Sequence, residues 1–160
     1  MSGAECTIRP SRRQDAAAAA AIWADTARQH HGFDAEAWCW AEDAQAQWMA
    51  SFIDLLDRPE MLMLTAERDG LLVAFAVAQI KPRSAVYAEG REGFIWDLGV
   101  RRDCRRQGLG RKLMDATFAE LKARGVSDVI LHVAAANKAA TKLYESMGMR
   151  VIMHRMYGKL

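Results

Sequence analysis

The chain of 160 residues has few of the features that mark secreted, membrane-bound or metal-binding proteins. Its three cysteines, Cys6, Cys39 and Cys104, are scattered and include no CxxC pair, which argues against a disulfide framework and a zinc ribbon. No stretch approaches the roughly 18 apolar residues of a membrane span, and the first residues lack the apolar core of a signal peptide. We therefore expect a cytoplasmic protein without membrane contact and without a metal site.

An excess of charge of one sign is also missing. The 22 basic and 20 acidic side chains leave a net charge of +2, so a broad basic surface for nucleic acid is not expected. Hydrophobic residues make up 51% of the chain and charged residues 26%, as in globular proteins. Because this length suits one hydrophobic core, we predict a single domain over residues 1–160.

Apolar periodicity and turn signals predict a mixed α/β domain. Two apolar runs around Asp69-Gly70 predict a β-hairpin, and Trp48, Phe52 and Leu55, at i, i+4 and i+7, predict the buried face of a helix. In chain order the expected elements are a strand at 6–10, helical regions at 14–30 and 34–58, strands within 61–82 and at 94–100, a helix at 109–125, a strand at 128–133, a helix at 137–148 and a strand at 150–157.

The stretch RRQGLGR, residues 105–111, is the most unusual local feature. It is not a nucleotide P-loop, and as a dinucleotide fingerprint it lacks the third glycine, because Leu113 stands there. Glycines let backbone N–H groups approach phosphate oxygens, a helix start adds positive potential, and arginines add charge-assisted hydrogen bonds. The stretch therefore suits a pyrophosphate, while a solvated glycine-rich turn and a DNA-contacting loop stay open as alternatives.

Two motifs together resemble the GNAT family of N-acetyltransferases. RRQGLG is similar to Q/R-x-x-G-x-G/A, the coenzyme A pyrophosphate motif of that family, and NKAATKLYESMGM at 137–149 is similar to N-x-x-A-x-x-L-Y-x-x-x-G-F. The chain departs from the family pattern at Arg102, Arg106 and Met149, and Trp96 precedes Asp97 where many relatives carry a glutamate. The two motifs make the resemblance specific over about 94–151.

The resemblance implies the GNAT acyl-CoA N-acyltransferase fold. This is an α/β (α+β mixed) fold with a central, mostly antiparallel mixed sheet, splayed between its fourth and fifth strands and flanked by helices. Acceptor-side helices are then expected at about 11–58 and the acetyl-CoA-binding core at about 94–151.

The resemblance also implies a set of site residues. The pyrophosphate would be held by Arg105, Arg106, Gln107, Gly108, Leu109, Gly110 and Arg111, and the pantetheine arm by the backbone of Leu98, Gly99 and Val100, with Gly99 marking a bulge. Asn137 would cap its helix and contact the cofactor arm, and Tyr144 would donate a proton to the coenzyme A sulfur. Asp97, acting through a water, is our first candidate for the general base and Glu92 the second.

These expectations lead to an enzyme that moves the acetyl group of acetyl-CoA directly to a primary amine, with a homodimer implied by resemblance alone. A non-catalytic acyl-CoA sensor and a nucleic-acid-binding module are the alternatives. The acceptor pocket could include His30, His31, Trp38, Trp40 and Trp48, although an exposed helix end is the simpler explanation of the histidines and core packing that of the tryptophans.

Overall fold

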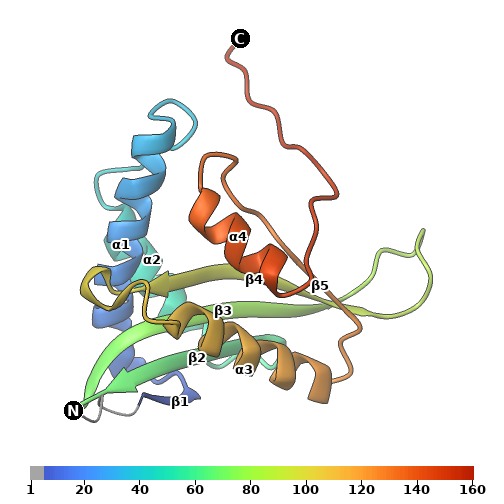
Figure 1. Cartoon of the computed structure of the whole chain (residues 1–160), viewed down its shortest axis with the longest axis horizontal. Helices are drawn as coiled ribbons and strands as arrows, with labels where there is room; N and C mark the ends of the chain where they lie inside the picture. Colours follow the sequence, from blue (N-terminus) through green and yellow to red (C-terminus); the bar gives the residue numbers. More distant parts are fainter. Residues whose placement is uncertain (1–5) are drawn as a thin grey trace.

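The structure is a computed structural model that describes residues 6–160, and Figure 1 shows a five-stranded sheet with helices on both faces. The elements are β1 (Thr7–Pro10), α1 (Ala16–Phe33), α2 (Ala44–Leu55), β2 (Met61–Arg68), β3 (Leu71–Pro82), β4 (Arg91–Val100), α3 (Leu109–Ala123), β5 (Asp128–Leu131) and α4 (Lys138–Ser146), with short 3-10 turns at Arg13–Asp15 and Arg102–Cys104. The expected order of elements is confirmed as far as α4.

The sheet follows the chain order β1-β2-β3-β4-β5. The first four strands are antiparallel neighbours, and the predicted hairpin joins β2 to β3 through Asp69 and Gly70, whose φ angles of 53° and 75° fit a tight turn. Strands β4 and β5 are parallel, so they need the crossover that α3 supplies.

Strand β3 is buried on both faces and divides the core in two. Its small side chains Ala74, Ala76 and Ala78 face α3, where they leave room for larger apolar side chains of that helix. Phe75 and Val77 face α1 and α2. Because both faces of the strand are covered, it reads as a nearly continuous apolar run in the sequence.

The helical region expected at 34–58 is shorter in the structure. Asp34 accepts hydrogen bonds from the backbone N–H groups of Glu36 and Ala37, which closes a local turn, and α2 begins only at Ala44. Phe52 is buried, and Trp48 and Leu55 pack against the same core, as their helical spacing predicted.

Two features of β4 create an opening in the sheet. Its ladder with β5 ends at the pair Ile95 and Leu131, so the stretch from Trp96 to Val100 has no strand partner on that side among the described residues. This is the expected splay between the fourth and fifth strands. On the other side Val77 pairs with Asp97 while Ala78 pairs with Ile95, which leaves Trp96 as the extra residue of a β-bulge.

The bulge was expected at Gly99, and that expectation is wrong. Gly99 pairs regularly with Phe75, and a Cβ at Gly99 would lie 2.5 Å from Cε1 of the Phe75 ring and 2.9 Å from Cγ2 of Ile22. The Phe75 ring and α1 pack so closely on the backbone at Gly99 that a side chain has no room there. The bulge lies at Trp96 instead.

The final strand expected at 150–157 is also absent. The segment has no regular structure, its residues are exposed, and it runs from the end of α4 away from the sheet (Figure 1). Its run of apolar residues suits a strand, but a strand forms only where an edge pairs with it, and none of residues 6–160 pairs with this segment.

Candidate functional site

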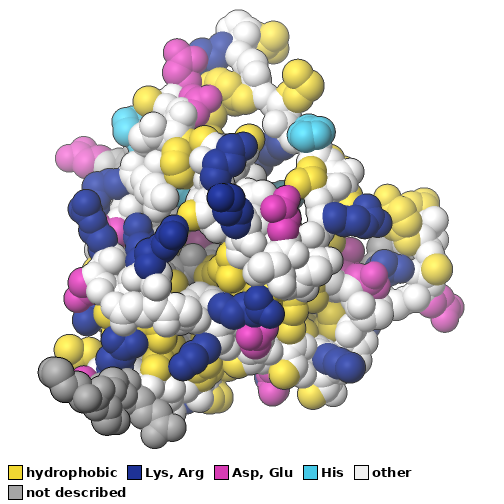
Figure 2. Space-filling view, viewed as in Figure 1, with side chains coloured by type: hydrophobic (Ala, Val, Ile, Leu, Met, Phe, Trp, Pro, Cys, Tyr) yellow, Lys and Arg dark blue, Asp and Glu magenta, His cyan; other side chains and the backbone are white. Residues whose placement is uncertain are grey.

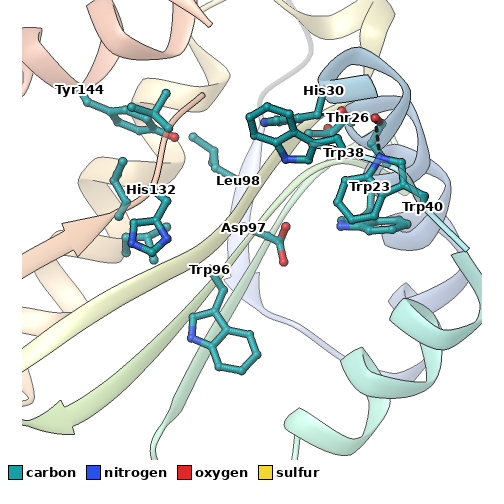
Figure 3. Close-up of a pocket in the computed structure, with 14 residues that line it drawn as sticks. Trp23, Thr26, His30, Trp38, Trp40, Trp96, Asp97, Leu98, His132 and Tyr144 are labelled. Carbon is teal, nitrogen blue, oxygen red and sulfur yellow. Dashed lines mark hydrogen bonds between the residues drawn. The ribbon is translucent and has the colours of Figure 1, made fainter. Parts of the chain in front are cut away.

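A pocket of about 170 Å³ lies where β4 and β5 diverge. Figure 3 shows Tyr144 and His132 on one side, His30 and three tryptophans on the other, and Asp97, Leu98 and Trp96 of β4 between them. The lining residues are Trp23, Thr26, Ala27 and His30 of α1, Trp38 and Trp40 of the loop before α2, Ile95, Trp96, Asp97 and Leu98 of β4, Leu131, His132 and Val133 at the end of β5, and Tyr144 of α4.

The bulge determines where Asp97 points. Residues two apart in a regular strand share one face of the sheet, yet Ile95 belongs to the core beside α3 while Asp97 reaches Trp48 on the α1 and α2 side. The extra residue between them, Trp96, reverses the alternation. The Asp97 carboxylate therefore points into the pocket, although Ile95, two positions earlier in the same strand, packs in the core.

Asp97 is more basic than an exposed aspartate. Burial raises the pKa of its carboxyl above the ordinary value, and the hydrogen bond from Trp48 Nε1 to Asp97 Oδ2, at 3.2 Å, and the charge of His30 only partly oppose that shift. A carboxylate with a raised pKa that opens onto a pocket can accept a proton there.

Tyr144 faces the same pocket from α4. Burial, with a contribution from the negative charge of Asp97, raises the pKa of the phenol to about 12. The hydroxyl oxygen points into the space beside Leu98 (Figure 3). Tyr144 therefore stays protonated at neutral pH and can donate its proton.

Tryptophans form the wall opposite Tyr144. Trp40 is fixed by a hydrogen bond of 3.0 Å from its Nε1 to the carbonyl oxygen of Ala27, and Trp23 packs edge-on against Trp40 with ring centroids 5.4 Å apart. Trp23 also stacks on Trp48 at 5.6 Å, and Trp48 holds Asp97. Trp38 and Trp40 therefore line the pocket, whereas Trp48 is a core residue that positions the carboxylate.

The two histidines at the end of α1 have different positions. His30 lines the pocket, with Nδ1 2.8 Å from the carbonyl oxygen of Thr26 and its ring 5.4 Å from that of Trp38. His31 is exposed, and its Nδ1 lies 3.1 Å from the carbonyl oxygen of Trp38. The structure places only the first in the pocket.

The sequence analysis missed several lining residues, among them Trp23, Trp96 and His132. Trp23 precedes Thr26, Ala27 and His30 by three, four and seven positions, a helical spacing that could have placed it on the same face of α1. The position of Trp96 depends on the β-bulge, and no local sequence pattern predicts that bulge. Glu92, the second candidate base, does not line this pocket and instead forms an ion pair with Lys81 at 2.9 Å.

The glycine-arginine stretch forms the loop before α3. Gly108, at φ 77°, is the N-cap of α3, and no side chain caps that helix start, so its first backbone N–H groups are free to meet a ligand. Leu109 is buried and anchors the helix. A Cβ added at Gly110 would meet Leu143 and Val100 at ordinary van der Waals distances. The loop presents backbone donors as the motif requires.

The arginines of the loop differ in their engagement. Arg105 Nε donates to the carbonyl oxygen of Val100 at 2.9 Å, and Arg111 binds Asp115 and Ser146, which ties α3 to α4. Gln107 bridges Arg68 and the carbonyl oxygen of Asp103. Arg106 is exposed at φ 64°, and within residues 6–160 its side chain has no ion pair or hydrogen bond. It is the arginine freest to meet an anion.

Lys and Arg side chains are spread over the face that carries α3 and α4, as Figure 2 shows. Within residues 6–160 there is no group of three or more His, Cys, Asp or Glu side chains that could hold a metal ion. No helix of this part of the chain is long and apolar enough to cross a membrane. The absence of a metal cofactor stays a prediction.

Comparison with solved structures supports the fold. The chain superposes on a mutant of the BH1408 protein from Bacillus halodurans with a TM-score of 0.87 at 22% identity, covering 96% of this chain and 99% of that one. It superposes on ribosomal-protein-alanine N-acetyltransferase from Brucella melitensis with a TM-score of 0.71 at 20% identity, covering 98% and 99%.

Sequence comparison identifies the family. The chain is 43% identical over 83 residues to mycothiol acetyltransferase from Thermobispora bispora, a match covering 52% of this chain and 28% of the relative. It is 38% identical over 81 residues to [ribosomal protein bS18]-alanine N-acetyltransferase from Escherichia coli, covering 51% and 49%. The matches thus span about half or less of these curated relatives. The model of the acetyltransferase (GNAT) family matches residues 14–149, and the chain belongs to this family.

Proposed function

We propose that the chain is an N-acetyltransferase that moves the acetyl group of acetyl-CoA, the cosubstrate of its family, directly to a primary amine in the gap between β4 and β5. The observation that carries this proposal is that a carboxyl with a raised pKa, Asp97, and a phenol with a raised pKa, Tyr144, face one pocket. The carboxyl can accept a proton, and the phenol holds a proton at neutral pH that it can donate.

The residues divide the chemistry as follows. Acetyl-CoA supplies a thioester whose carbonyl carbon accepts the amine. Asp97, through a water, takes the proton that the acceptor ammonium must lose before it can attack. Backbone N–H groups of the unpaired edge of β4 polarise the carbonyl, and Tyr144 donates its proton to the departing sulfur. No covalent enzyme intermediate is needed.

The cofactor arm and its phosphates would follow the remaining predicted residues. The open edge of β4 at Leu98, Gly99 and Val100 suits the amide groups of a pantetheine arm, because hydrogen bonds from that edge have no other strand to meet among the described residues. The free N–H groups at the start of α3 and the exposed Arg106 suit the pyrophosphate. Arg105 and Arg111 would act by holding the loop in place.

A calorimetric titration with acetyl-CoA tests this division. Because a hydrogen bond to a charged group contributes about 1.5–3 kcal/mol, Arg106→Glu should weaken acetyl-CoA binding at least tenfold. Arg102→Glu, a matched charge change in the neighbouring exposed turn, should weaken it much less. Tyr144→Phe should bind acetyl-CoA normally and lower amine-dependent coenzyme A release by about 10²–10⁴-fold.

Other results of these binding and turnover measurements would contradict the proposal or favour one of the alternative functions. Equal affinity of the Arg106 variant and the wild type would exclude Arg106 as a contact of the pyrophosphate. Tight acetyl-CoA binding without coenzyme A release for any amine would favour a sensor. Binding to nucleic acid that falls steeply with salt and ignores coenzyme A would favour the nucleic-acid-binding module.

A further inference from the structure

The acceptor side of the pocket is aromatic and carries almost no charge. Indole rings of Trp23, Trp38, Trp40 and Trp96 contribute to its lining. Among the described lining residues there is one carboxylate, Asp97, and there is no lysine or arginine. An acceptor that enters therefore meets flat apolar surfaces, one carboxylate and the imidazoles of His30 and His132.

The indoles at the rim are exposed although they are large and apolar. Trp40 is 43% exposed and Trp96 is 46% exposed, and Trp40 is held in place by its hydrogen bond to Ala27. A rigid aromatic face offers contact area to a ligand at little entropic cost and also attracts a cationic ammonium group. The rim is thus prepared for a ring or an apolar arm next to an amine.

The charges of the pocket exclude other kinds of amine. A free amino acid would bring its carboxylate near Asp97 with no lysine or arginine in the lining to pair with it, which is unfavourable in a partly buried site. A polyamine would bring several positive charges to a lining with one carboxylate. The lining fits an acceptor with one amine and no acid group.

The size of the pocket limits the acceptor as well. Its volume of about 170 Å³ is close to the cavity of about 150 Å³ that accommodates benzene in another protein, and it is below the roughly 300–1,000 Å³ of drug-sized sites. One ring with a short arm fits this volume.

Building on the proposed function, we infer that the acceptor is a small primary amine on an aromatic or apolar arm without a carboxylate. The ring packs against Trp40, and the amine points toward Asp97. Trp40 determines specificity, whereas Asp97 and Tyr144 perform the proton transfers.

The test compares kcat/KM for three amines that differ by one feature. Phenethylamine should exceed phenylalanine, which adds a carboxylate, and propylamine, which lacks the ring, by at least tenfold each. Trp40→Ala should raise KM for phenethylamine at least fivefold with little change for propylamine, and Trp40→Phe should restore most of the loss. Tyr87→Ala removes an exposed aromatic residue outside the pocket and should change nothing.

Failure of this inference can be separated from failure of the proposed reaction. Turnover of phenylalanine or propylamine as fast as of phenethylamine, or an unchanged KM in Trp40→Ala, would overturn the acceptor class and leave the acetyltransferase standing. Quenching of tryptophan fluorescence by phenethylamine in the coenzyme A complex, reduced in Trp40→Ala, would support the acceptor class even without turnover. Absence of both binding and turnover would overturn it.

Discussion

At the scale of single residues, the buried carboxylate of Asp97 lowers the stability of the fold and accepts a proton in the proposed reaction. Its carboxyl is desolvated, and one side-chain donor, Trp48, reaches it at 3.2 Å. Because the pKa is higher in the fold than in the unfolded chain, the ionised form is destabilising. The cost is absent below the unfolded pKa, develops as pH rises toward the folded pKa, and is fully present above it.

We therefore predict opposite effects of Asp97→Asn on stability and activity. At neutral pH the variant should unfold at a higher temperature, by roughly 2–4 °C if about 1 kcal/mol is relieved, and the gain should vanish at acidic pH. Its kcat should fall by about 10²–10⁴-fold, and the loss of activity that the wild type shows on acidification should disappear. Thermal unfolding and pH–rate profiles measure both effects, and a less stable variant would contradict this account.

Gly99 gives a purely steric prediction at the same scale. A methyl group there would lie within 2.5 Å of Phe75 Cε1, so Gly99→Ala should lower the free energy of unfolding by about 1–3 kcal/mol. Phe75→Leu in the same chain should recover part of that loss. Gly32→Ala meets nothing within 4 Å and should be neutral or stabilising. Equal stability of the Gly99 and Gly32 variants in urea titrations would show that β4 and α1 can separate.

At the scale of elements, the position of Tyr144 depends on a short helix. None of the residues of α4 is fully buried, and Asn137 caps the helix by accepting the N–H of Ala140 at 3.2 Å. Asn137→Ala should destabilise the chain by about 0.5–2 kcal/mol and also lower turnover, because Tyr144 is carried by this helix. Asn137→Asp keeps the cap and should restore stability.

The same pair of variants tests the second predicted role of Asn137. If its side chain also contacts the cofactor arm, Asn137→Asp should keep the wild-type unfolding temperature and raise KM for acetyl-CoA severalfold. A wild-type KM for acetyl-CoA in Asn137→Asp would show that Asn137 caps the helix and does not contact the cofactor arm. An unchanged unfolding temperature in Asn137→Ala would contradict the capping role.

At the scale of the whole molecule, the features that depend on local sequence patterns could be predicted, whereas the features that depend on pairing between distant residues could not. The hairpin at Asp69-Gly70, the helix after Gly108 and the order of elements follow from turn chemistry and periodicity, which act over a few residues. The bulge at Trp96 and the absence of a strand at 150–157 depend on partners distant in the sequence. For that reason the orientation of Asp97 and the part of the pocket built by Trp96 required the structure.

The central claim is direct transfer between two substrates bound together at the gap between β4 and β5. Initial rates of coenzyme A release, with acetyl-CoA and phenethylamine varied together, test it most directly. The account predicts intersecting double-reciprocal lines, an N-acetylated amine as product, and a large loss of kcat in Tyr144→Phe. Parallel lines with an acetylated protein intermediate, or no release of coenzyme A that depends on any amine, would contradict it.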